Sequence, residues 1–78
     1  MKMPKRTLVA EVLEATGLKV DNDGNVLEGG AIVGSLTPEG DFHYPPLHRL
    51  WAATLIIKKV MRRLGCSTVC SEAWKPNA

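Results

Sequence analysis

The residues best suited to chemistry are two histidines and two cysteines, and each pair is closely spaced in the chain. Four residues separate His43 from His48, and three separate Cys66 from Cys70. Two imidazoles and two thiolates are a common ligand set for tetrahedral zinc. However, a continuous helix from Pro46 to Gly65 would hold His48 and Cys66 about 27 Å apart, which one ion cannot bridge within a chain. We therefore expect no metal, no other cofactor and reduced thiols. A zinc site built by a head-to-tail dimer and a redox role of the thiols are the alternatives.

A second candidate is acid–base chemistry at one end of the predicted sheet. A histidine with nearby cations can cleave RNA by general acid and base catalysis. The polar side chains available there are Ser35, Thr37, Glu39, Asp41, His43 and His48. The chain has no nucleophile motif, no glycine-rich phosphate loop and no paired carboxylates. We therefore predict that the protein is not an enzyme, and a small ribonuclease-type toxin is the third hypothesis for its function.

The strongest signal is a basic surface interleaved with apolar residues in the second predicted helix. The predicted binding residues are Arg49, Trp51, Leu55, Ile56, Lys58, Lys59, Arg62 and Arg63. Tryptophan and arginine are enriched where proteins bind one another, whereas cations beside an aromatic ring also suit phosphates and bases. Three explanations stay open: docking on a larger protein or nucleoprotein, direct RNA or DNA binding, and coverage by the chain's own N-terminal helix or C-terminal tail. A homodimer through this surface is a further alternative.

This surface depends on a helix predicted over residues 46–64, the longest periodic segment of the chain. Pro46 suits the first turn, where a missing amide proton costs no hydrogen bond, and Gly65 suits the position after the last turn. At about 100° per residue, one arc of the helix is apolar and is predicted to face the core. That arc consists of Leu50, Ala53, Ile57, Val60, Met61 and Leu64.

The remaining elements are predicted from turn residues and short apolar runs. Residues 1–6 are expected to be a flexible basic lead-in, and residues 7–16 a helix capped by Thr7 and ended by Gly17. Residues 18–44 are predicted to form antiparallel strands with turns at 21–24 and 37–40, each with glycine in fourth position. The Gly29-Gly30 pair allows three strands, which we prefer, or four. Residues 66–78 are expected to be an irregular tail anchored by Trp74.

The predicted fold class is therefore α+β, with a small antiparallel sheet flanked by an N-terminal helix and a long C-terminal helix. Its 78 residues, 45% of them hydrophobic and 23% charged, fit one small globular domain. The net charge of +2 is too small to indicate nucleic-acid binding by itself. Acidic residues interrupt the first apolar run, and the uncharged stretch 50–57 is too short to cross a bilayer. We expect a cytoplasmic protein that does not contact membranes.

The predicted order of elements is similar to that of double-stranded-RNA-binding domains and of the small RNA-cleaving toxins of bacterial toxin–antitoxin pairs. The RNA-binding domains carry a Gly-Pro-x-His loop and a lysine cluster at the start of the second helix. In those places this chain has DNDG or EGGA, and PPLHR. The toxins carry a Gly-Ser/Thr-His motif, which this chain lacks. The resemblance is one of layout, and layout alone does not define function.

Together these patterns favour a small regulatory module without enzymatic activity, of the kind typical of phage or plasmid proteins. It would dock on a larger protein or nucleoprotein through the basic and apolar face of its second helix. RNA or DNA binding by the same face is the second hypothesis.

Overall fold

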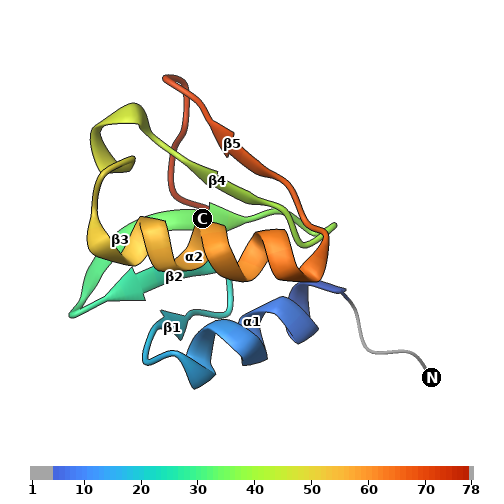
Figure 1. Ribbon diagram of the computed structural model, residues 1–78. Helices are drawn as coiled ribbons and strands as arrows, with labels where there is room; N and C mark the ends of the chain where they lie inside the picture. Colours follow the sequence, from blue (N-terminus) through green and yellow to red (C-terminus); the bar gives the residue numbers. More distant parts are fainter. Residues whose placement is uncertain (1–4, 78) are drawn as a thin grey trace.

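The computed structural model describes residues 5–77 and has two helices on one face of a five-stranded mixed sheet (Figure 1). In chain order the elements are α1 Lys5–Ala15, β1 Lys19–Val20, β2 Asn25–Glu28, β3 Ala31–Leu36, β4 Phe42–Tyr44, a 3₁₀ turn η1 Pro46–His48, α2 Ala52–Leu64 and β5 Thr68–Cys70. The strands lie side by side in the order β1-β2-β3-β4-β5. The predicted α+β class is confirmed.

The first four strands form an antiparallel meander, so the four-strand alternative holds for residues 18–44 and the preferred three strands are wrong. Gly29 and Gly30 have φ of 57° and 86° and form the two-residue turn between β2 and β3. Two positive φ angles in succession are the conformation that tight hairpins need and that glycine adopts without strain. The turns at 21–24 and 37–40 lie at the other two hairpin tips, as predicted.

A fifth strand corrects the prediction of an irregular tail over residues 66–78. β5 pairs with β4 in parallel, with Phe42 opposite Thr68 and Tyr44 opposite Cys70. Parallel neighbours need a long crossover connection, and α2 supplies it. Gly65, with φ of 72°, ends the helix in a left-handed conformation and returns the chain along β4. A three-residue strand has too few residues for its pattern to stand out in the sequence.

The second helix is shorter than predicted, because the chain breaks between the 3₁₀ turn and α2. Trp51 is extended (φ −63°, ψ 140°) and α2 begins at Ala52, so residues 46–64 are not one continuous helix. The break removes Leu50 from the predicted core arc, and Leu50 is 75% exposed. Thr54 is fully buried instead, and Leu64 at the other end is 39% exposed. Ala53, Ile57 and Met61 face the core as predicted.

The first helix begins earlier than predicted. Lys5 and Arg6 are already helical, so Thr7 is not the N-cap, and the other residues of the predicted lead-in lie outside the described range. Gly17 ends the helix with φ of 96°. The amide of Leu18 donates to the carbonyl of Leu13 at 3.3 Å, and Leu18 is buried against the last turn.

The core lies between the helices and the sheet. It is built from Val9, Leu13, Leu18, Val26, Val33, Leu36, Phe42, Tyr44, Ala53, Ile57 and Met61. The opposite face of the sheet is crossed by residues 71–77, which return from β5 towards the centre of the sheet (Figure 1). Within residues 5–77, no helix combines the length and apolar character needed to cross a membrane.

Candidate functional site

Five large apolar side chains are exposed within ten residues at the junction of η1 and α2. Leu47 and Leu50 are 83% and 75% exposed, and Trp51, Leu55 and Ile56 are each about two fifths exposed. We call these five residues the apolar surface. Isolated exposed apolar residues are common, whereas exposed apolar residues in a group are typical of binding surfaces, which makes this group a candidate site.

The position of this surface follows from local backbone chemistry. Pro45 and Pro46 end β4 and begin the 3₁₀ turn, because proline cannot continue a strand ladder but fits the first turn of a helix. The turn is too short to bury Leu47 and Leu50, and the extended Trp51 then starts α2 in a new direction. The apolar surface thus lies where the backbone changes direction between η1 and α2, and it is not one face of a single regular helix.

His48 holds Trp51 in place. The two rings stack with centroids 3.8 Å apart, and His48 Nδ1 donates a hydrogen bond to the carbonyl of Val33 at 2.8 Å. That carbonyl belongs to a β-bulge: Val26 pairs with Gly34 and Leu27 with Ile32, so the β2–β3 register skips Val33. A histidine that the sequence marks as a chemical candidate therefore orients the central aromatic ring of the apolar surface.

The chain covers this surface only in part. α1 packs beside α2 on the same face of the sheet, and the C-terminal segment lies behind the sheet (Figure 1). Trp51, Leu55 and Ile56 nevertheless stay 39%, 45% and 41% exposed. Neither the N-terminal helix nor the tail encloses them.

The predicted cations are concentrated in the other half of α2. Lys58 and Arg62 line a hollow of about 370 Å³ beside β5, together with Tyr44, Cys66 and Thr68. The ammonium of Lys58 lies 4.9 Å from the centroid of the Tyr44 ring, a cation–π contact that fixes its direction. Lys59, Arg62 and Arg63 are exposed, and Arg49 is exposed beside the apolar surface. The eight predicted binding residues therefore form two groups. The first group is apolar except for Arg49, and the second consists of the four cations between Lys58 and Arg63.

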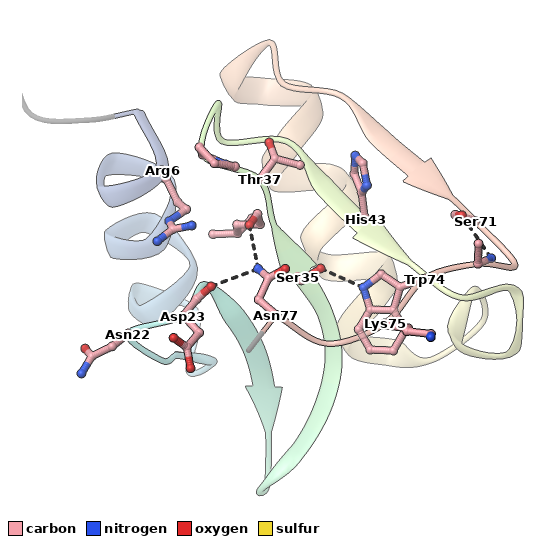
Figure 2. A pocket seen from close by; sticks show the side chains of 13 residues that line it. Arg6, Asn22, Asp23, Ser35, Thr37, His43, Ser71, Trp74, Lys75 and Asn77 are labelled. Atoms are coloured by element: carbon pink, nitrogen blue, oxygen red, sulfur yellow. Dashed lines mark hydrogen bonds between the residues drawn. The ribbon is translucent and has the colours of Figure 1, made fainter.

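A second hollow, of about 630 Å³, lies on the opposite face of the sheet, which the C-terminal segment crosses (Figure 2). We call it the tail-side hollow. The residues that matter for its chemistry are Arg6, Ser35, Thr37, His43, Ser71 and Trp74. Ser35 and His43 are cross-strand partners in β3 and β4, and the indole Nε1 of Trp74 donates to Ser35 Oγ at 2.8 Å.

Some of the side chains considered for acid–base chemistry meet in this hollow and others do not. Ser35, Thr37 and His43 line it, whereas His48 is bound to Val33 and Asp41 accepts a hydrogen bond from the Ser67 amide. Sequence reasoning missed Ser71, Lys75 and Asn77 because it treated the tail as irregular. Trp74 was the signal in the sequence that the tail packs on the rest of the protein, because a ring of that size is seldom left exposed.

The cysteines and histidines do not assemble into one site. Both thiols are free. Within the described range, residues 5–77, no three His, Cys, Asp or Glu side chains come together as metal ligands would. No protein family, curated protein or solved structure matches this chain in sequence or fold. Function therefore has to be argued from the surfaces themselves.

Proposed function

We propose that the protein is a non-enzymatic interaction module that docks on a larger protein through the apolar surface. The observation that carries this proposal is the exposure of Leu47 and Leu50, at 83% and 75%, beside a tryptophan held rigidly by His48. Side chains fixed before binding lose little conformational entropy when a partner covers them. Tryptophan and arginine, here Trp51 and Arg49, are the residue types that contribute most binding energy at interfaces.

The charges around the apolar surface favour an acidic partner over a second copy of this chain. Arg49 lies beside the apolar surface, and Lys59 and Arg63 follow on the exposed side of α2. In a two-fold dimer the same patch faces itself, so these cations would be brought together. A partner with an apolar hollow and carboxylates at its rim would instead complement both the apolar and the basic parts.

The test compares the wild-type protein with Leu50→Ser in affinity capture, followed by binding measurements with the purified partner. Leu50 is 75% exposed, so its replacement should leave folding stability within about 0.5 kcal/mol. The matched control is Val69→Ser, which removes an exposed apolar side chain from β5. We expect wild type and Val69→Ser to retain an acidic protein that Leu50→Ser loses, with Kd weakened about tenfold or more.

Two results would contradict this proposal. One is that Leu50→Ser binds the captured protein as tightly as wild type does. The other is a stable homodimer of the wild type in sedimentation experiments that Leu50→Ser converts to monomer, because a second copy would then be the occupant of the surface.

RNA or DNA binding stays the second hypothesis because Lys58 and Arg62 share a hollow with the hydroxyl of Thr68. Phosphate contacts release counterions, so affinity should fall steeply with salt. Replacing Lys58 and Arg62 together by alanine should flatten that dependence. If the wild type binds neither RNA nor DNA at low salt, this hypothesis is wrong.

A further inference from the structure

The tail-side hollow presents hydroxyl protons that the described chain does not use. Ser35 Oγ accepts from Trp74 Nε1 at 2.8 Å, Thr37 Oγ1 from the Asp41 amide at 3.1 Å, and Ser71 Oγ from the Ala73 amide at 3.3 Å. A hydroxyl oxygen that accepts one hydrogen bond still has its own proton to donate. Within residues 5–77 these three hydroxyls act only as acceptors, so their protons are available to a ligand.

Ser35 makes this arrangement a formed site rather than an open surface. Its side chain is only 5% exposed, because residues of the C-terminal segment lie over it. His43, directly opposite on β4, points to the same side of the sheet, where paired side chains lie about 5 Å apart at Cβ. A buried hydroxyl and an imidazole are therefore carried by directly paired residues of two neighbouring strands.

The charges of the hollow also favour an acceptor-rich ligand. Its lining includes the cations Arg6 and Lys75 and one carboxylate, Asp23. Figure 2 shows Arg6 and Asp23 on the α1 side, while His43 and Lys75 lie on the side of the tail and β5. The anionic part of a ligand is thus expected near His43, away from Asp23.

We propose that the tail-side hollow binds a small ligand through a phosphate group, whose oxygens accept hydrogen bonds from Ser35 and His43. A phosphate offers three acceptor oxygens and negative charge, and hydrogen bonds to a charged acceptor are the strong ones. The volume of about 630 Å³ leaves room for the organic part of a phosphorylated small molecule. This site lies on the face of the sheet opposite the helices and does not depend on the docking proposal.

The test is an NMR titration of the ¹⁵N-labelled protein with inorganic phosphate and, separately, with ribose 5-phosphate; ribose and sodium chloride serve as controls. We expect saturable shifts of the Ser35, His43 and Ser71 amides with both phosphates and none with the controls. Tighter binding of ribose 5-phosphate would identify a phosphate ester as the ligand class, and equal binding would identify the phosphate group alone.

Two variants distinguish the loss of a phosphate contact from the loss of the hydrogen bond that attaches the tail. Ser35→Ala and Trp74→Phe break the same hydrogen bond, but only Ser35→Ala removes the hydroxyl donor. We expect Ser35→Ala and His43→Ala each to weaken phosphate binding about tenfold, and Trp74→Phe to weaken it less than Ser35→Ala does. Lys58→Ala, outside this hollow, should leave phosphate binding nearly unchanged. The proposal is overturned if no saturable shift occurs, if Ser35→Ala and His43→Ala bind as well as wild type, or if the shifts centre on Lys58 and Arg62.

Discussion

The two faces of the sheet are covered in different ways. On the helix side, α1 and α2 bury apolar side chains completely, and Leu36 and Phe42 are 0% exposed. On the tail side, Asn25 and Ser35 are almost as well buried, at 3% and 5% exposed, but the C-terminal segment reaches them by hydrogen bonds. Burying a large apolar side chain contributes about 1.5–3 kcal/mol, whereas a hydrogen bond contributes about 1 kcal/mol net.

The difference suggests that the two sides serve different purposes. The helix side holds the fold together and gives the apolar surface a rigid base. The tail side is held by hydrogen bonds from Trp74 and Asn77 that are separately weak, so we expect it to open before the sheet unfolds. In our two proposals a small ligand binds on the tail side, whereas a docking partner binds the apolar surface around Trp51.

The largest effect is expected from Phe42→Ala on the helix side. It removes a fully buried ring that stacks with Tyr44 at a centroid distance of 5.6 Å, so it should cost about 3–5 kcal/mol of unfolding free energy. His43→Ala, the next residue on the other face of β4, is the control and should cost less than about 1 kcal/mol. Urea unfolding measures both, and Phe42→Leu serves if the alanine variant does not fold. Equal losses at the two positions would contradict the contrast between the faces.

The sequence predicted the element types well where a glycine or proline sets the backbone. Gly17 and Gly65 end the two helices, and glycines close the turns at 21–24 and 37–40. It failed where tertiary contacts decide. The stack of His48 on Trp51 and the hydrogen bond to Val33 accompany the break in the second helix, and the carbonyl of Val33 is available only because of a bulge in a different strand.

The candidate site was predictable to a similar degree. Trp51, Leu55 and Ile56 were identified because they interrupt the basic pattern of the helix, and they are exposed. A continuous helix puts Leu50 on the apolar arc and so predicts that it lies in the core, but the break before Ala52 turns it outwards. The sequence groups Ser35, Thr37 and His43 at one end of the sheet, and these three side chains line the tail-side hollow. The tail residues that complete the hollow show no local pattern, because their position depends on a long-range hydrogen bond from Trp74 to Ser35.

A smaller effect is expected from Trp74→Phe on the tail side. The change keeps an aromatic ring but removes the indole N–H that donates to Ser35 Oγ, so it should cost about 1 kcal/mol. Hydrogen exchange should become faster at the amide of Asn77, which donates to Asn25 Oδ1, and stay unchanged in β4. Leu50→Ser is the control, because it changes an exposed side chain that does not line the tail-side hollow. Exchange that becomes faster to the same extent in the core strands would show that both faces unfold as one unit, and would contradict the prediction.

The smallest effect is expected at Asp21, whose carboxylate indirectly supports the tail. Slight desolvation raises the pKa of this exposed carboxyl, but hydrogen bonds from the Asn25 amide and side chain and from the Asp23 amide outweigh that effect, and the pKa lies below its ordinary value of 3.8. Asn25 in turn donates to the Asn77 carbonyl at 2.9 Å. Because the folded pKa is the lower one, the stability from this group is fully present above the unfolded pKa and is lost as the pH falls through the folded value.

Asp21→Asn tests this linkage. An asparagine amide in place of one carboxylate oxygen would face the Asn25 side-chain amide, donor against donor, so the variant should be less stable at neutral pH. Below about pH 4, the stability of the variant should change less with pH than that of the wild type. The plots of stability against pH for the two proteins should therefore converge in acid. Asp23→Asn, in the same turn, removes a carboxylate that does not hold Asn25 and is the control. Thermal midpoints measured across this range check the prediction; parallel curves for wild type and Asp21→Asn would mean that the carboxylate charge does not stabilise the tail side.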